Sequence, residues 1–341
     1  MRQLTLTDVR TAEWTEVPEP ELQGPGEALV RALAVALCDL DQPIIDGAVP
    51  SERPMALGHE GVAEVVAVGE AVTSVKPGDR VIVPFQISCG ECEHCRRGLT
   101  ATCTTTPHRA TYGLGALGGH EWGGLLADLT RVPYADHMLV PVPDGIASAT
   151  VASFSDNVPD AWRAVGPGLR DWPGADVLVM GGGARSIGLY AAALARALGA
   201  GEVVYSDTDA ARLAAAERLG ARPLEGPPPK RAGSFAVTVD AAVGGDGLAC
   251  ALRSTAPHGA CTSATVHFEP QTTIPLLEMY DRCCSLHTGR CNARPPLEEL
   301  LGLVVDGRFD PAAITTHVAA WDDAPEAVLE PQTKLVLERA A

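Results

Sequence analysis

The feature that most constrains this chain is a run of four cysteines within 15 residues, CGECEHCRRGLTATC. The spacing C-x2-C-x2-C-x7-C lets four thiolates converge on one tetrahedral ion from a glycine-containing loop, and four sulfurs with no open position are typical of structural zinc. An iron–sulfur cluster is the alternative, since ferredoxins also place cysteines two residues apart. The chain has one such run and no proline after its last cysteine, which favours zinc. The predicted ligands, in a lobe over residues 86–108, are Cys89, Cys92, Cys95 and Cys103.

Composition narrows the class of protein. With 341 residues, 46% hydrophobic and 20% charged, the chain is long enough for two soluble globular domains. A net charge of −17 disfavours nucleic acid and anionic membranes as partners, so a small molecule is expected instead. No apolar run reaches the roughly 20 residues of a membrane-spanning helix, and the first residues lack the apolar stretch of a signal peptide, which predicts a cytoplasmic location. The ten cysteines should then be thiols or metal ligands.

A second pattern begins at residue 176 and alternates strand, glycine turn, helix, strand and helix. Strands alternating with helices indicate a parallel sheet, and a glycine turn at a helix N-terminus presents backbone N–H groups to pyrophosphate. Gly181, Gly183 and Gly188 are spaced G-x-G-x4-G, two residues longer than the usual dinucleotide fingerprint. The inserted Arg185 and Ser186 add donors that can contact phosphate. The segment therefore predicts one half of a dinucleotide-binding fold.

Asp207 ends the next strand, 19 residues after the last glycine of the turn. An acid there accepts hydrogen bonds from the adenosine ribose and repels a 2′-phosphate, so NAD is favoured, although Arg212 could admit NADP. The alternative role of Asp207 is to cap the following helix, which Asp209 can also do. A further buried strand is predicted over residues 235–244. The candidate cofactor-binding residues are Gly181, Gly183, Arg185, Ser186, Ile187, Gly188, Asp207 and Arg212.

Two residues upstream of the cysteine run are ambiguous when taken alone. Cys38 follows an apolar run and stands beside Asp39 and Asp41, and a lone intracellular cysteine is usually a small buried hydrophobe. His59 stands at the entrance to a β-rich segment and is either a hydrogen-bonded core residue or a metal ligand. The sequence around each residue leaves both readings open.

The motifs GHEGVAEVVAVG and KPGDRV, the four-cysteine lobe and the glycine turn occur in the order found in zinc-dependent medium-chain alcohol dehydrogenases, which the chain resembles over essentially its whole length. Residues 112–144 resemble the formaldehyde dehydrogenase branch. The resemblance implies an α/β fold with a GroES-like β-rich catalytic domain over 1–155, a doubly wound Rossmann domain over 156–290 and a return to the catalytic domain over 291–341. It also implies an alcohol or aldehyde substrate in a cleft between the domains, NAD, two zinc ions per chain and a homodimer or homotetramer.

The same resemblance assigns a catalytic zinc with three protein ligands and an open fourth position. Cys38 and His59 match the first two ligands, and Asp156 matches the third, as in the formaldehyde dehydrogenase branch. Glu60 matches an acid that lies beside the zinc and can approach it, and Asp41 matches a carboxylate that orients the histidine. The alternative role of Asp156 is to cap the helix that follows.

One part of the family pattern is missing. Relatives carry a hydroxyl two residues after the ligand cysteine to pass on the alcohol's proton, and commonly a histidine further along, whereas this chain has Leu40 and Pro43. Three accounts remain: another acid acts, with Asp160 first and Glu60 second; the proton passes through water and the cofactor ribose; or activity is slow or lost. The predicted catalytic residues are Cys38, His59, Glu60, Asp156 and Asp160.

The predicted function is a zinc-dependent oxidoreductase that transfers a hydride between an alcohol or aldehyde and NAD. The alternatives are a cofactor-binding protein with weak or lost dehydrogenase activity, and an aldehyde dismutase or lyase that retains NAD. Leu40 and three aromatic residues either form an apolar substrate pocket or fill the core; the three are Phe85, Trp122 and Trp162.

Overall fold

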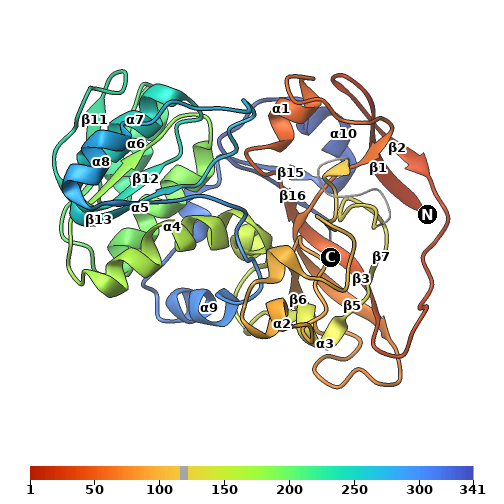
Figure 1. Cartoon of the computed structure of the whole chain (residues 1–341). Coiled ribbons are helices and arrows are strands. Elements are labelled where there is room, and N and C mark those ends of the chain that lie inside the picture. The colour runs from red at the N-terminus through yellow and green to blue at the C-terminus, as the bar shows by residue number, and fades with distance from the viewer. Residues whose placement is uncertain (116–121, 341) are drawn as a thin grey trace. The chain divides into compact units, whose positions relative to one another are not determined.

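The structure is a computed structural model that describes residues 1–115 and 122–340 (Figure 1). It divides into two compact units, which are described separately. The first comprises Met1–Pro159, Asn292–Val305 and Thr315–Ala341, and the second comprises Asp160–Cys291 and Asp306–Ile314. The domain limits predicted from the sequence stay a prediction. Residues 116–121, which belong to the stretch resembling formaldehyde dehydrogenases, lie outside the described residues.

The first unit is built on two β-sheets. The smaller has the strand order β2-β1-β4, and the larger has the order β15-β16-β3-β5-β6-β8, with β7 also paired to β3. The strands are β1 (Arg2–Asp8), β2 (Thr11–Glu16), β3 (Ala28–Ala36), β4 (Met55–Ala56), β5 (Glu60–Val68), β6 (Arg80–Val83), β7 (Thr130–Val132), β8 (Val140–Pro141), β15 (His317–Ala320) and β16 (Leu335–Glu338). Apolar residues on β3, β5 and β6 fill the core, since Val30, Val62 and Ile82 are fully buried.

The register of three antiparallel strands brings distant residues to one end of the larger sheet. Ala36 at the end of β3 pairs with Glu60 at the start of β5 and with Val336 on β16. Cys38, His59 and Lys334 each lie one or two residues from these paired positions. The sheet itself therefore gathers three polar side chains that are far apart in sequence.

The remaining elements of the first unit are short helices. They are α1 (Asp41–Ile45), α2 (Glu93–Arg96), η1 (Thr100–Thr102), α3 (Ala135–Met138), η3 (Ser148–Ser155), α9 (Leu297–Val305), η5 (Trp321–Asp323) and α10 (Ala324–Ala327). The Ser155 hydroxyl at the end of η3 accepts the Gly61 N–H at 2.8 Å and donates to the Gly61 carbonyl at 3.1 Å. This double contact fixes Asp156 beside the start of β5.

The second unit contains a six-stranded parallel sheet of order β11-β10-β9-β12-β13-β14. Its strands are β9 (Val177–Met180), β10 (Val203–Asp207), β11 (Arg222–Glu225), β12 (Phe235–Asp240), β13 (Thr255–Ser263) and β14 (Ser285–His287). The helices are α4 (Asn157–Asp171), which begins in the first unit, and α5 (Arg185–Ala197), α6 (Ala210–Arg218), α7 (Gly245–Ser254), α8 (Leu276–Arg282) and η4 (Pro311–Ile314). The order reverses between β9 and β12, as in dinucleotide-binding sheets, and the predicted fold class is confirmed.

One predicted boundary in the second unit is wrong. The strand predicted to end at Gly244 ends at Asp240, because the chain then turns so that Ala241 and Ala242 accept backbone hydrogen bonds from the glycine turn. The inserted Arg185 and Ser186 lie at the N-terminus of α5, which begins at Arg185. The inserted pair therefore forms the first turn of α5.

In the described ranges, no helix has the length and apolar character needed to cross a membrane.

Candidate active site

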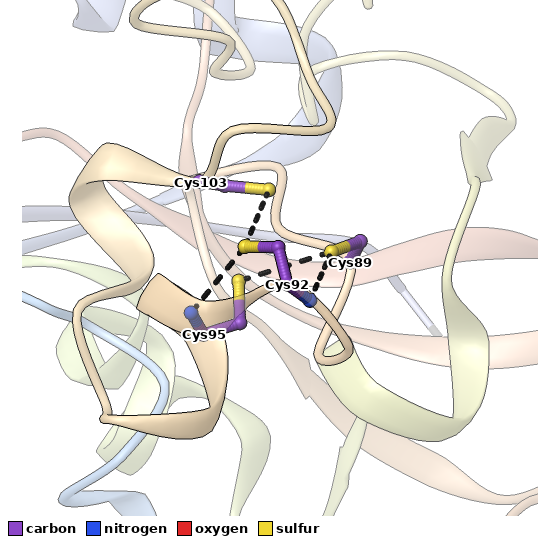
Figure 2. A group of neighbouring side chains, drawn as sticks. All are labelled: Cys89, Cys92, Cys95 and Cys103. Carbon is purple, nitrogen blue, oxygen red and sulfur yellow. Dashed lines mark hydrogen bonds between the residues drawn. The ribbon is translucent and has the colours of Figure 1, made fainter.

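The four-cysteine lobe is compact. The Sγ atoms of Cys89 and Cys95 lie 4.0 Å apart, as do those of Cys92 and Cys103. Figure 2 shows the four side chains converging, and their sulfurs all lie within 4.8 Å of one another. Sulfur ligands at about 2.3 Å from one tetrahedral ion are about 3.8 Å apart. An iron–sulfur cluster needs a wider spacing between the cysteine sulfurs, because it binds them through separate iron atoms. The lobe therefore fits a single ion such as zinc.

Backbone N–H groups stabilise the sulfurs of the lobe. Cys92 caps α2, and its Sγ accepts the Cys95 N–H at 3.4 Å. The Sγ of Cys89 accepts the N–H groups of Glu91 at 3.4 Å and Cys92 at 3.3 Å. Hydrogen bonds from the Thr104 backbone and then from the Cys95 backbone lower the pKa of Cys92 to about 5. The loop is therefore folded to hold thiolates.

A second group of donors gathers at the end of the larger sheet. One ligand atom from each of Cys38, His59, Glu60 and Asp156 lies within 4.8 Å of the other three. The Nε2 atom of His59 and Oδ2 of Asp156 are 3.4 Å apart. Nitrogen and oxygen ligands of one tetrahedral zinc, at about 2.1 Å from the ion, are about 3.4 Å apart. The predicted catalytic ligands therefore lie together at metal-ligand spacing.

The imidazole of His59 is the clearest sign that this group holds a cation. Its side chain is fully buried, and neither ring nitrogen makes a hydrogen bond to any described residue. A buried polar group without a partner is costly, and native proteins rarely keep one. A metal ion at Nε2 would supply the missing partner, which also disfavours the alternative of a hydrogen-bonded core histidine.

The electrostatics of the four donors also favour a bound cation. Burial raises the pKa of the Cys38 thiol well above its usual range, and the carboxylates of Asp156 and Glu60 raise it further. Burial raises the pKa of Glu60 to about 7. Burial lowers the pKa of His59, but the carboxylates of Asp41 and Asp156 outweigh it and raise the value to about 9. Acids that repel one another in a buried site are stabilised by a bound cation.

Asp41 lies behind the donor group, on α1. Its Oδ2 accepts the Cys38 N–H at 2.8 Å, and its Oδ1 lies 3.6 Å from Nδ1 of His59. The contact with Cys38 is a hydrogen bond, whereas the distance to His59 is too long for one. Asp41 thus fixes the Cys38 backbone and faces the side of the imidazole that points away from Asp156.

Lys334 lies beside the donor group, and sequence reasoning missed it. It is 1% exposed, and its Nζ donates to Oε2 of Glu60 at 2.6 Å and to the Leu37 carbonyl at 2.7 Å. The Asn157 N–H donates to the other oxygen, Oε1, at 3.0 Å. The available signal was a lysine directly before the apolar strand LVLE, but only the pairing of β16 with β3 shows where it lies.

The residues considered for the proton relay are placed as follows. Leu40 is the N-cap residue of α1, and its N–H points to Sγ of Cys38 at 3.5 Å. Asp160 lies in the second unit, where its Oδ1 accepts a short hydrogen bond from Nε of Arg163. Its role as a proton acceptor stays a prediction.

The aromatic residues considered for a substrate pocket each have packing partners. The ring of Phe85 is buried, with its centroid 5.8 Å from that of His59. The Arg131 guanidinium stacks on Trp122 at 5.2 Å, and the Arg170 guanidinium stacks on Trp162 at 4.8 Å. Phe85 therefore packs against the donor group.

In the second unit, Asp207 accepts hydrogen bonds from two neighbouring side chains. Arg212 donates to it through Nε and Nη2, both at 2.8 Å, and the Tyr205 hydroxyl donates at 3.0 Å. Burial raises the pKa of Asp207, but the Arg212 hydrogen bonds outweigh it and lower the value. Asp209 caps α6 by accepting the Arg212 N–H at 2.9 Å, so the capping role falls to Asp209.

The glycine turn packs closely on this group. A Cβ on Gly181 would lie 2.4 Å from the Tyr205 hydroxyl, so the first glycine is needed for the turn to approach β10. The N–H of Gly183 donates to the Ala242 carbonyl at 3.0 Å. Arg185, Ser186 and Ile187 are the first three residues of α5. The turn and the acid thus lie side by side at the carboxyl ends of β9 and β10.

A cavity of about 630 Å³ lies at the carboxyl ends of β12 and β13. None of the predicted cofactor residues lines it; its walls are the start of α7 and the segment after β13. His267 on its wall lies 3.1 Å from the buried carboxylate of Asp240, which also accepts the Ser263 hydroxyl at 2.9 Å. The cavity occupies the sheet edge at which doubly wound folds bind their ligands.

A β-rich unit with a four-sulfur lobe and a Cys–His–acid group, in one chain with a doubly wound parallel sheet, defines a metal-dependent dehydrogenase with a nucleotide cofactor. Comparison with known proteins agrees. The model of the alcohol dehydrogenase GroES-like domain matches residues 24–144. Over 330 residues the chain is 31% identical to the "Probable zinc-binding alcohol dehydrogenase Rv1895" of Mycobacterium tuberculosis, covering 95% of this chain and 83% of that protein. The chain belongs to the zinc-type medium-chain alcohol dehydrogenase family of oxidoreductases.

Two further relatives refine the comparison. The chain is 36% identical over 222 residues to the glutathione-independent formaldehyde dehydrogenase of Pseudomonas aeruginosa, a match covering 61% of this chain and 54% of that protein. Among solved structures, the alcohol dehydrogenase of Thermus sp. ATN1 superposes with a TM-score of 0.89 and 28% identity, and each chain is fully covered. The match to the formaldehyde dehydrogenase is thus partial, whereas the fold is shared along the whole chain.

Proposed function

We propose that this protein transfers a hydride between an alcohol or aldehyde and NAD, with zinc held by Cys38, His59 and Asp156. The observation that carries the proposal is the His59 imidazole, which is buried without a hydrogen bond among donors at metal-ligand spacing. Zinc in such a site supplies Lewis acidity, which favours the alkoxide of an alcohol or polarises an aldehyde. A second zinc in the four-cysteine lobe serves stability.

The chain's own residues set up the reaction. Cys38 and Asp156 provide negative charge to the metal site, and Asp41 fixes the backbone of Cys38 through a 2.8 Å hydrogen bond. The glycine turn, Arg185, Ser186 and Ile187 would bind the cofactor pyrophosphate at the start of α5, and Asp207 with Arg212 would bind the adenosine ribose. Because Asp207 is paired with Arg212, NADP is a cofactor to test beside NAD.

For the proton, we infer a route through water and the cofactor ribose. Leu40 is a hydrocarbon, both oxygens of Glu60 accept hydrogen bonds, and Asp160 is paired with Arg163. Leu40 cannot carry a proton, and the two carboxylates are each paired with a cation, which disfavours their protonation. Loss of one acid–base group typically costs about 10²- to 10⁴-fold, which predicts a slow but active enzyme.

The substrate class belongs to the same proposal. The 36% identity to a formaldehyde dehydrogenase over 222 residues supports a small aldehyde or its hydrate. The family resemblance, which implies an acid as the third metal ligand in that branch, agrees with this substrate class. A homodimer or homotetramer in the cytoplasm remains the expectation from the family resemblance.

The test is a panel of alcohols and aldehydes followed by NADH absorbance, with NAD and NADP in parallel. Turnover with a small substrate that depends on added NAD supports the proposal. Nucleotide binding without turnover would favour a cofactor-binding protein, and turnover without added cofactor would favour a dismutase or lyase that retains NAD.

A further inference from the structure

His267 and Asp240 form a pair at the carboxyl end of the parallel sheet in the second unit. Nε2 of His267 lies 3.1 Å from Oδ2 of Asp240, whose carboxylate is fully buried, whereas the His267 side chain is 20% exposed and lines the cavity. A hydrogen bond to a carboxylate fixes the orientation of an imidazole and the nitrogen that carries its proton. The proton of the neutral ring therefore lies on Nε2, which leaves Nδ1 as the basic atom.

The neighbouring Ser263 does not turn this pair into a nucleophilic group. Its hydroxyl donates to Oδ2 of Asp240 at 2.9 Å and lies 3.4 Å from Nε2 of His267. A serine nucleophile needs a histidine that bonds the serine through one nitrogen and the acid through the other, whereas here both partners face Nε2. Among the described residues, none hydrogen-bonds to Nδ1. The arrangement is a histidine held by an acid, with its second nitrogen able to exchange a proton.

The strand order relates His267 to the cofactor. The proposed adenosine and pyrophosphate residues, Asp207 and the glycine turn, follow β10 and β9. In the order β10-β9-β12-β13, a dinucleotide that continues in the same direction places its second nucleoside over β12 and β13. The turn also touches this end of β12, because the Gly183 N–H donates to the carbonyl of Ala242, two residues after Asp240, at 3.0 Å. The nicotinamide half of NAD would thus lie on the side of the sheet edge that holds His267.

The charges around His267 favour its protonated form. The hydrogen bond to Asp240 raises the pKa of His267, burial lowers it, and the negative charges of Asp240 and Glu269 raise it further, so that the net shift is upward. The other charged groups near the pair are Asp246 and Arg253 on the cavity wall and Arg163, which donates to the Ser263 carbonyl at 3.1 Å. An imidazolium is stabilised at this position, as a proton acceptor requires.

We propose that Nδ1 of His267 accepts the proton of the alcohol at the end of the route through water and the cofactor ribose, with Asp240 as its positioning residue. The proposal rests on the proposed function. In the oxidation, the C–H bond of the alcohol gives a hydride to NAD, and the O–H bond gives a proton to the adjacent water or ribose hydroxyl. That hydroxyl passes a proton to Nδ1, and the imidazolium then releases it to solvent.

The first measurement does not depend on turnover. The full chain with ¹³C-labelled histidine is titrated by NMR, and the His267 signal is the one lost in His267→Gln. We expect the pKa of His267 to be lower in the complex with NAD than in the complex with NADH, because only the oxidised nicotinamide carries a positive charge that disfavours the protonated ring. Equal pKa values in the two complexes would overturn the proposal.

The second measurement is the pH profile of kcat for alcohol oxidation. Wild-type kcat should fall as the pH drops below the pKa of His267. In His267→Gln the amide can still bond Asp240 but has no basic atom, so we expect kcat to be at least about 10-fold lower, with this fall absent and the KM for NAD little changed. In Asp240→Asn the fall should move to lower pH, since the negative charge that raises the pKa is gone.

A matched control replaces another histidine of the same strand. His258 is exposed in the first half of β13, and His258→Gln should leave both the NMR titration of His267 and the pH profile unchanged. Wild-type kcat and pH profile in His267→Gln would overturn the proposal. A wild type that binds no NAD, or that oxidises no alcohol of the panel, would overturn the proposed function as well, so the two failures are distinguishable.

Discussion

The two metal-ligand groups of this chain are built in opposite ways. The lobe takes its four sulfurs from a single loop, and the hydrogen bonds that hold them come from backbone N–H groups of the same loop. The group at Cys38, His59 and Asp156 is assembled by strand register and by the Ser155 contact to Gly61. A local site can be recognised from spacing, whereas an assembled site depends on the whole unit folding first.

The largest effect is expected from Cys89→Ser, which removes one sulfur from the lobe. Structural zinc contributes about 10–16 kcal/mol of binding free energy that is linked to folding, so loss of a ligand should cost several kcal/mol of stability. Thermal unfolding followed by circular dichroism measures the loss. An unchanged melting temperature would mean that the lobe does not hold a structural metal.

Asp156→Ala tests the other group. We expect at least about 100-fold lower activity, since even residues that only support metal ligands cost 10- to 100-fold, together with a melting temperature near that of the wild type. Substrate-dependent NADH formation and thermal unfolding give the two readouts. Full activity in this variant would remove Asp156 from the ligand set, and a stability loss as large as that of Cys89→Ser would erase the contrast between the groups.

As the pH is lowered, the two ligand groups should lose their metal ions at different pH values. Metal binding displaces protons, so a ligand with a raised pKa binds metal more weakly as pH falls below that pKa. The pKa of His59 is about 9 and that of Cys38 is raised further, whereas the pKa of Cys92 in the lobe is about 5. Within the lobe the shifts oppose each other, because burial raises the pKa of Cys95 to about 12 while backbone hydrogen bonds lower that of Cys92. In the assembled group, the pKa values of both Cys38 and His59 are raised, so its metal competes with protons at higher pH.

Titration from pH 9 to pH 6 in the presence of a chelator should therefore release the metal of the assembled group first. The released zinc can be followed with a colorimetric indicator, and Cys38→Ser serves as the control that lacks the first release. Simultaneous release of both metals, or earlier release from the lobe, would contradict the predicted order.

The smallest effect is expected from Asp41→Asn. The amide can still accept the Cys38 N–H but loses the negative charge that faces His59 at 3.6 Å. Groups that support metal ligands typically contribute 10- to 100-fold in metal affinity, and we expect the lower end because the Asp41–His59 distance exceeds a hydrogen bond. Competition with a chelator measures the metal affinity. A higher affinity in the variant, or an affinity change confined to the four-cysteine lobe, would refute the role of Asp41.

The sequence predicted the local features well. The gathering of the four cysteines, the strand at the start of the pattern from residue 176, the glycine turn after it and Asp207 at the end of β10 all agree with the sequence prediction, because each depends on neighbouring residues. The end of β12 was wrong because its last predicted residues pair with the glycine turn, a contact between distant segments.

The catalytic group could be predicted only through family resemblance. Nothing near Cys38 or His59 in the sequence distinguishes a ligand from a core residue, since their proximity follows from the pairing of β3 with β5. Lys334 was missed for the same reason: its partner Glu60 is 274 residues away in the chain. Tyr205, which donates to Asp207, is hidden in the sequence by its place in a buried strand.

The most direct measurement is the zinc content of the purified wild type and of Cys38→Ser, each normalised to the protein concentration. If Cys38 belongs to an assembled site that is separate from the lobe, the wild type contains two zinc ions per chain and the folded variant contains one. Two zinc ions in folded Cys38→Ser, or only one in the wild type, would contradict the assignment.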